Sequence, residues 1–172
     1  MTTQFMPLQV AVLTVSDTRT EETDSSGDLL LALASAAGHK TLTKSIIPDD
    51  VYKIRAAVSI WIAAPEVQVI LITGGTGFSG RDSTPEAVVP LLDKEVVGFG
   101  ELYRQISYRE VGSSTVQSRA TAGLVNRTMI FCLPGSNNAC KTAWEGILAD
   151  QLDNRHKPCN FATYLHPAGA SG

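Results

Sequence analysis

The sequence predicts an α/β fold in which helices cover a mainly parallel sheet. Short runs rich in β-branched residues alternate along the chain with segments that carry apolar residues at helical spacing. Turns containing glycine or proline separate these segments, a pattern typical of parallel strands joined by right-handed crossover helices. The length of 172 residues fits a single domain over residues 1–172.

The composition excludes several classes of protein. Hydrophobic residues make up 44% of the chain and charged residues 18%, which excludes a disordered chain, a coiled coil and a collagen. The net charge of -3 lacks the positive field that phosphate-backbone binding requires, so we expect no nucleic-acid partner. No apolar run reaches the ~18 residues that span a bilayer and no leader opens the chain, so we expect a cytoplasmic protein without a membrane partner. The few charges and a mean hydropathy of +0.05 indicate a homo-oligomer.

The cysteines and histidines form no disulfide or zinc pattern. Cys132, Cys140 and Cys159 are an odd number and include no Cys-x-x-Cys pair. The histidines are scattered singly, without a His-x-x-x-His spacing. We therefore expect reduced, packed thiols and no zinc site.

The first half of the chain predicts strands and helices in strict alternation. In order, the elements are a buried strand at 9–16, a helix capped by Asp24, Ser25 or Ser26 and ending at Gly38, an outer strand at 41–47, a helix through 51–62 and a central strand at 67–73.

The second half continues the pattern. A capping box at Ser83-Thr84-Pro85-Glu86 predicts a helix that begins near Thr84. The following elements are an amphipathic helix through 99–106, a third helical face formed by Val116, Ala120 and Leu124, a buried strand at 128–133 and a last helix from about 138 to 152.

Residues that directly follow the predicted strands are the candidates for ligand binding, because ligands of open α/β sheets bind at the carboxyl ends of strands. They are Ser16 and Asp17, then Pro48-Asp49-Asp50, then the glycine loop Thr73-Gly74-Gly75-Thr76-Gly77 with Asp82, and finally Pro134, Gly135 and Ser136. The glycine loop has few side chains to block close approach, so its backbone N–H groups and threonine hydroxyls can hold an anion. A plain turn is the alternative.

The glycine loop does not fit either of two common phosphate-binding fingerprints. Residues 75–80 formally match the G-x-G-x-x-G of dinucleotide-binding folds. In that fold the helix opens within the glycine motif, whereas here the capping box delays the helix until after Ser83. No Gly-Lys-Ser/Thr is present, which excludes a Walker A loop.

The aspartates after the strands, Asp17, Asp49 and Asp82, suit magnesium, which one or two carboxylates and substrate phosphates usually hold. Helix capping is the alternative for Asp49, while the residues after Asp82 already supply a cap. Glu101 lies on the polar side of a predicted helix, where plain exposure is the simpler interpretation. The residues alone indicate a magnesium-dependent enzyme or a binder of a phosphorylated small molecule.

Six short motifs follow one another along the chain: Thr14-Val15-Ser16-Asp17, Asp24-Ser25-Ser26-Gly27, Thr73-Gly74-Gly75-Thr76-Gly77, Arg81-Asp82-Ser83-Thr84-Pro85-Glu86, Gly98-Phe99-Gly100-Glu101 and Leu133-Pro134-Gly135-Ser136. Their order and spacing resemble the molybdopterin-binding domain of molybdenum cofactor biosynthesis proteins. The resemblance covers a core of about residues 7–165. Residues 137–140 and 156–161 resemble the MoaB branch of the MoaB/MogA family more than the MogA branch.

The resemblance implies a three-layer α/β/α subunit that forms a trimer, or a hexamer of two trimers. It also implies adenylyl transfer from Mg-ATP to molybdopterin with release of pyrophosphate. Molybdenum is inserted afterwards, and a separate molybdenum-insertion protein is a possible partner. By position, Asp49 and Asp82 would be the catalytic carboxylates and would hold Mg²⁺. The substrate and nucleotide pocket would comprise Ser16, Asp17, Thr73, Gly74, Gly75, Thr76, Gly77, Glu101, Pro134, Gly135 and Ser136.

Two other functions stay open. Some similar proteins of the MoaB branch carry Asn in the position of Asp17, and the aspartate here favours catalysis. A non-catalytic molybdopterin carrier is the first alternative. A nicotinamide-dependent oxidoreductase is the second, and the late helix start after the glycine loop disfavours it.

Overall fold

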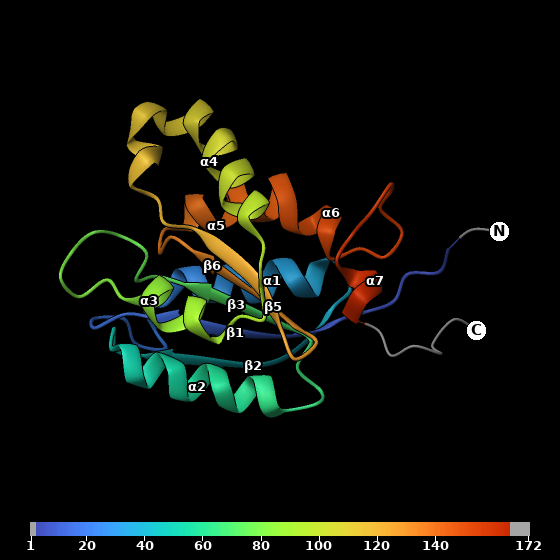
Figure 1. Ribbon diagram of the computed structural model, residues 1–172, viewed down its shortest axis with the longest axis horizontal. Helices are drawn as coiled ribbons and strands as arrows, with labels where there is room; N and C mark the ends of the chain where they lie inside the picture. The colour runs from blue at the N-terminus through green and yellow to red at the C-terminus, as the bar shows by residue number, and fades with distance from the viewer. Residues whose placement is uncertain (1–2, 166–172) are drawn as a thin grey trace.

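The structure, a computed structural model that describes residues 3–165, is built on a sheet of six strands in the order β2-β1-β3-β6-β5-β4 (Figure 1). The pairs β2–β1, β1–β3 and β3–β6 are parallel, and the pairs β6–β5 and β5–β4 are antiparallel. The mainly parallel sheet is therefore confirmed. The strands are β1 (Gln9–Val15), β2 (Lys40–Ile47), β3 (Val69–Thr73), β4 (Lys94–Glu95), β5 (Thr121–Val125) and β6 (Thr128–Leu133).

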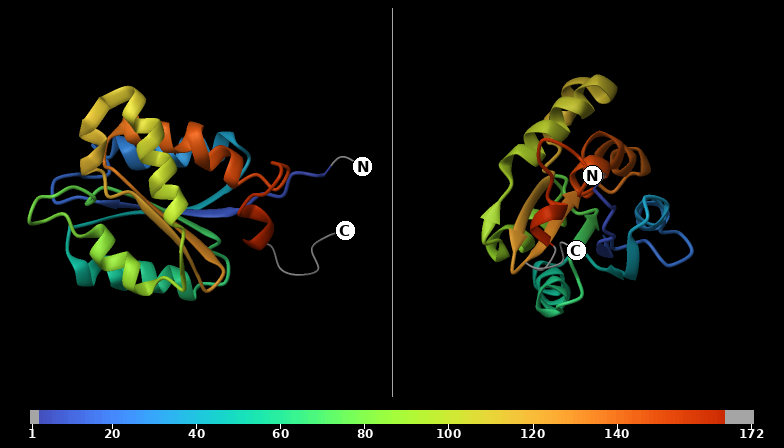
Figure 2. Two further views of the ribbon diagram at one scale, coloured as in Figure 1. Left: turned by 45° about the horizontal axis from the view of Figure 1, so that its top comes forward. Right: turned by 90° about the vertical axis from the view of Figure 1, so that its right-hand side faces the viewer.

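Helices cover both faces of the sheet, which confirms the three-layer α/β/α arrangement (Figure 2). One face carries α1 (Ser25–Ala36), α4 (Val97–Val111) and α5 (Asn137–Ala143), and the other carries α2 (Val51–Ala63) and α3 (Thr84–Val88). Helix α5 continues through the π-helical turn η3 (Trp144–Leu148) into α6 (Ala149–Gln151). The remaining elements are the 3-10 turns η1 (Val89–Leu91) and η2 (Gly112–Gln117) and the short α7 (Ala162–Leu165).

Each central strand feeds the two hydrophobic cores with alternate side chains, because successive residues of a strand point to opposite faces. In β3, Leu71 packs toward α1 and α4, whereas Ile70 and Ile72 pack toward α2. Phe131 and Ile130 divide in the same way in β6. Strands buried on both faces explain why the sequence shows continuous apolar runs there.

One predicted element is wrong, and three observed elements, β4, β5 and α7, are missing from the prediction. Val116, Ala120 and Leu124 do not form a helical face, because Val116 ends up in the turn η2 and Leu124 in the strand β5. Residues 121–125 pair with β6 instead, and such tertiary pairing overrides a chance helical spacing. The two-residue strand β4 carries no sequence signal of its own.

Some of the aspartates cap helices, and only those that do not cap a helix can take part in a ligand site. Asp24 accepts from the Gly27 amide at 3.0 Å, and Asp50 accepts from the amides at the start of α2. Asp50 therefore caps α2, and Asp49 is left for the site. At α3 the expected side-chain cap is absent, since Ser83 and Thr84 use their hydroxyls elsewhere, although the helix does begin at Thr84.

Candidate functional site

The glycine loop after β3 and the turn after β6 meet at one edge of the sheet. The Gly74 amide donates to the Leu133 carbonyl at 3.0 Å, and a Cβ on Gly135 would lie 3.2 Å from the Gly74 Cα. A cavity of about 440 Å³ opens beside them. Of the predicted site residues, its lining includes Gly74, Gly75, Thr76, Gly77, Asp82, Pro134, Gly135 and Ser136. The structure thus brings these residues together, and their binding role stays a prediction.

The glycine loop is pressed against β1 and the start of α3. Gly74 and Gly75 have φ of +102° and +66°, a backbone conformation that favours glycine. A Cβ on Gly74 would lie 2.2 Å from the Val15 carbonyl oxygen, and the Thr84 hydroxyl donates to the Gly74 carbonyl at 2.9 Å. Only residues without a side chain can bring the backbone this close to β1.

Asp82 is the predicted carboxylate that reaches the cavity. Its Oδ2 accepts from the Ser79 amide at 2.7 Å, which folds the loop back on itself. A Cβ on Gly77 would lie 2.8 Å from the same oxygen. The carboxylate is therefore seated directly against the backbone of the glycine loop.

Arg119, which no sequence motif singles out, fastens this loop from the chain segment before β5. Its guanidinium donates to the carbonyls of Thr76 at 3.3 Å, Gly77 at 2.9 Å and Asp82 at 3.1 Å. It also pairs with Glu86 of α3. A charged group with several fixed donors can hold three carbonyls at once, so Arg119 positions the loop.

Asp49 lies buried beside the glycine loop, outside the cavity lining. Its Oδ1 accepts from the Ser83 amide at 3.0 Å and from the Ser83 hydroxyl. A Cβ on Gly75 would lie 2.7 Å from its Oδ2. Burial raises the pKa of Asp49, the bonds from Ser83 oppose the rise, and the charges of Asp82 and Asp17 add to it. A cation placed between these carboxylates would relieve their repulsion.

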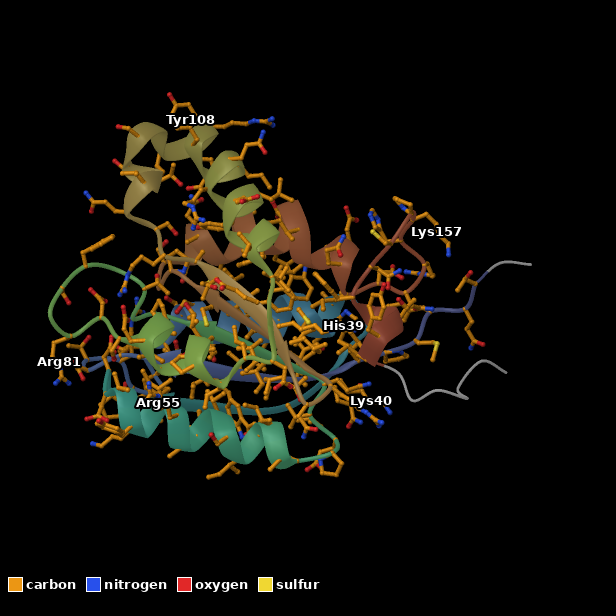
Figure 3. The ribbon with its side chains drawn as sticks, viewed as in Figure 1. His39, Lys40, Arg55, Arg81, Tyr108 and Lys157 are labelled. Atoms are coloured by element: carbon orange, nitrogen blue, oxygen red, sulfur yellow. The ribbon has the colours of Figure 1, made fainter. Side chains whose placement is uncertain are left out.

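Asp17 lies beside Asp49 and forms hydrogen bonds with Asp49 and Arg81. Its Oδ1 accepts from the Asp49 amide at 3.1 Å. Arg81 donates to both carboxylate oxygens, at 2.9 and 2.8 Å, and holds the pKa of Asp17 below its usual range. Figure 3 shows Arg81 at the end of the molecule where the glycine loop projects. The ion pair links the loop after β1 to the loop after β3.

Replacing Arg81 with glutamine is expected to raise the pKa of Asp17 toward its ordinary value. The guanidinium stabilises the ionised carboxylate, so its loss favours the protonated form. A ¹³C NMR titration of the aspartate carboxyl groups measures the change. Arg155→Gln, which breaks the ion pair with Asp153 elsewhere, is the matched control and should leave Asp17 unchanged. An equal Asp17 pKa in Arg81→Gln and wild type would contradict the ion pair.

The other predicted residues hold the surrounding backbone or lie apart from the cavity. Ser16 accepts from the Arg19 amide at 3.1 Å and shapes its own loop. Thr73 is fully buried and donates to the Pro134 carbonyl at 3.2 Å, which joins the glycine loop to the turn after β6. Glu101 is exposed near the start of α4 and does not line the cavity.

Polar side chains of α4 and α5 form a wall of the cavity that the sequence motifs do not reveal. These residues are Tyr103, Ser107 and Glu110 of α4 and Asn138 and Thr142 of α5. Their spacings of about one and two helical turns put each set on one face of its helix. A polar stripe on an otherwise amphipathic helix is the signal that would have found them. Burial raises the pKa of Tyr103 to about 12, so its hydroxyl is a neutral donor.

No group of three or more histidine, cysteine, aspartate or glutamate side chains within residues 3–165 is arranged to hold a metal ion. Asp82 and its neighbour Asp49 supply carboxylate oxygens, which magnesium prefers. Magnesium commonly binds one or two carboxylates together with substrate phosphates. The chemistry of these two carboxylates fits Mg²⁺, and their role as its ligands stays a prediction.

Residues 11–154, which include every loop at the cavity, match the family described as "Probable molybdopterin binding domain". The chain belongs to this molybdopterin-binding family. It is 54% identical over 165 residues to "Molybdenum cofactor biosynthesis protein B" of Escherichia coli (strain K12), covering 96% of this chain and 97% of that protein. Membership and similarity support molybdenum cofactor biosynthesis as the process in which the protein works.

Solved structures of family members share the fold. A crystal structure of "Molybdenum cofactor biosynthesis protein B" superposes with a TM-score of 0.83 at 47% identity, covering 86% of this chain and 92% of that one. The tungsten cofactor synthesizing protein MoaB from Pyrococcus furiosus gives a TM-score of 0.76 at 39% identity, covering 84% and 92%. The similarity to the MoaB branch is therefore confirmed in sequence and fold. Within residues 3–165, no helix combines the length and the apolar character needed to cross a bilayer.

Proposed function

We propose that the protein is a molybdopterin adenylyltransferase, which transfers AMP from Mg-ATP to molybdopterin and releases pyrophosphate. The observation that carries the proposal is the shared cavity, where the glycine loop, Asp82 and the Pro134-Gly135-Ser136 turn meet. Backbone amides suit the phosphates of both substrates, and carboxylates suit the magnesium that accompanies ATP.

In the proposed reaction a phosphate oxygen of molybdopterin attacks the α-phosphorus of ATP. The bond from that phosphorus to the bridging oxygen breaks, and its electron pair leaves with pyrophosphate. Such transfers depend on positioning and on neutralising charge, so no protein nucleophile is required. The glycine loop would orient the phosphates, Asp82 and Asp49 would hold the magnesium of the nucleotide, and Arg119 would keep the loop in place.

The wild-type protein with molybdopterin and Mg-ATP tests the proposal by its release of pyrophosphate. Release that requires molybdopterin is the expected result. Molybdopterin binding without release would instead favour the non-catalytic carrier. The nicotinamide alternative lacks support from the fold, because α3 begins only at Thr84, beyond the glycine motif that such cofactors need at a helix start.

The proposal includes a cytoplasmic homo-oligomer, a trimer or a hexamer of two trimers, to which a molybdenum-insertion protein can bind. Large apolar side chains are exposed along the arm formed by α4 and η2. They are Val97, Leu102, Tyr108, Val111 and Val116, and Figure 3 shows Tyr108 on the outer part of this arm. Exposed apolar surface of this kind marks subunit contacts. Sedimentation equilibrium tests the oligomer, and a monomer at all concentrations would contradict it.

A further inference from the structure

We propose that Glu110 of α4 recognises the pterin ring by accepting from its adjacent N–H donors, so that the pterin binds at the wall formed by α4 and α5. The inference rests on the proposed function for the identity of the ligand. It names the residue that discriminates the pterin ring from the adenine ring. It also places the pterin and the phosphates at different ends of the cavity.

The Glu110 carboxylate is fixed in place at the cavity wall. The Thr142 hydroxyl lies 3.0 and 2.9 Å from its two oxygens, and the Asn138 side-chain amide donates to Oε2 at 2.8 Å. Both partners belong to α5 and line the same cavity. An anchored carboxylate is pre-organised for a ligand, because little side-chain freedom remains to be lost on binding.

The same carboxylate has acceptor capacity left over. An ionised carboxylate offers about four acceptor positions and no donor, and Thr142 and Asn138 each supply one hydrogen. Within residues 3–165 Glu110 makes no ion pair, and the cavity lining contains no lysine or arginine. Glu110 is exposed, so water can satisfy these acceptor positions in the free protein, and a ligand that carries N–H donors can replace that water.

The charge of Glu110 indicates which part of the ligand binds at each end of the cavity. A carboxylate repels phosphate, so the phosphates of the substrates lie toward the amides of the glycine loop. The amino-pyrimidinone ring of a pterin presents the ring N3–H and the 2-amino group side by side, and these two donors match the two oxygens of a carboxylate. Adenine offers its amino group between two acceptor nitrogens and cannot make this pair of bonds. Glu110 therefore favours the pterin.

Ser118 supplies an independent observation. Its hydroxyl is the one buried side-chain oxygen or nitrogen within residues 3–165 that has no hydrogen-bond partner, and Ser118 lines the same cavity. A buried polar atom without a partner is costly and needs an explanation. A polar atom of a bound heterocycle would satisfy it.

Isothermal titration calorimetry with 6-hydroxymethylpterin as the probe tests the role of Glu110. Glu110→Gln places an amide where one acceptor was, so the pterin is expected to bind at least about tenfold more weakly, as for the loss of a charge-assisted hydrogen bond. The affinity for Mg-ATP should not change. Glu145→Gln, an exposed glutamate outside the cavity lining, is the matched control and should leave both affinities unchanged.

A comparison of ligands needs no variant. Lumazine has an oxygen in place of the 2-amino group of pterin, so wild type should bind it about tenfold more weakly than pterin, and Glu110→Gln should erase this preference. Equal binding of the two ligands by wild type, no binding of the pterin, or an equal loss of pterin and Mg-ATP in Glu110→Gln would each overturn the inference. If wild type releases no pyrophosphate but binds pterin through Glu110, the adenylyltransferase proposal fails and the inference stands.

Discussion

Replacing Asp82 with alanine is expected to abolish pyrophosphate release, a loss of roughly 10²- to 10³-fold or more, while the protein stays folded. Asp82 is the predicted carboxylate that lines the cavity, where it lies against the glycine loop. Its removal opens no core cavity, and the Ser79 amide that loses its partner lies in an exposed turn that water can reach. Turnover is measured with molybdopterin and Mg-ATP, and folding by thermal melting followed with circular dichroism.

Two further variants separate charge from shape. Asp82→Asn keeps the acceptor for the Ser79 amide but loses the charge, and it should be as inactive as Asp82→Ala if the charge is what matters. Because the charge of Asp82 contributes to the raised pKa of Asp49, that pKa should fall in both variants. Asp150→Asn, an exposed aspartate outside the cavity lining, serves as control. Equal pyrophosphate release by wild type and Asp82→Asn would remove Asp82 from the mechanism.

The strands and most helices could be predicted because their signals are local. The runs at β1, β3 and β6 are buried on both faces, so their hydrophobicity is continuous and easy to read. Val116, Ala120 and Leu124 show the limit of this reasoning, since their spacing imitates a helix while pairing with β6 decides the structure.

The meeting of the loops at the site could be predicted from the topology of the sheet, whereas the strands and helices were predicted from local signals. The carboxyl ends of parallel strands share one edge of a sheet, so the topology alone brings the loops after β3 and β6 together. Whether Asp49 or Asp50 caps α2 could not be read from adjacent aspartates, because either side chain can reach the first amides. Arg119 could not be predicted, because its partners come from distant segments and are brought together only by the packing of the fold. The polar stripe on α4 could have marked Glu110, but its partners on α5 depend on how the two helices pack over the sheet.

Replacing Gly74 with alanine is expected to lower the free energy of unfolding by about 2–5 kcal/mol, the sum of an unfavourable backbone conformation and a steric clash. With φ of +102°, the residue lies where a side chain is strained, and a Cβ there would meet the Val15 carbonyl oxygen at 2.2 Å. That oxygen belongs to the backbone of β1, which is paired on both sides and cannot yield easily.

Denaturation with guanidinium chloride measures the loss as a lower midpoint with an unchanged slope. Gly80→Ala is the matched control in the same loop, because a Cβ on Gly80 meets no atom within 4 Å and its φ is not positive. It should change the free energy of unfolding by no more than about 0.5 kcal/mol. Equal stability of the two variants would mean that the glycine loop moves away from β1 in solution, and the anion-binding role proposed for the loop would lose its structural basis.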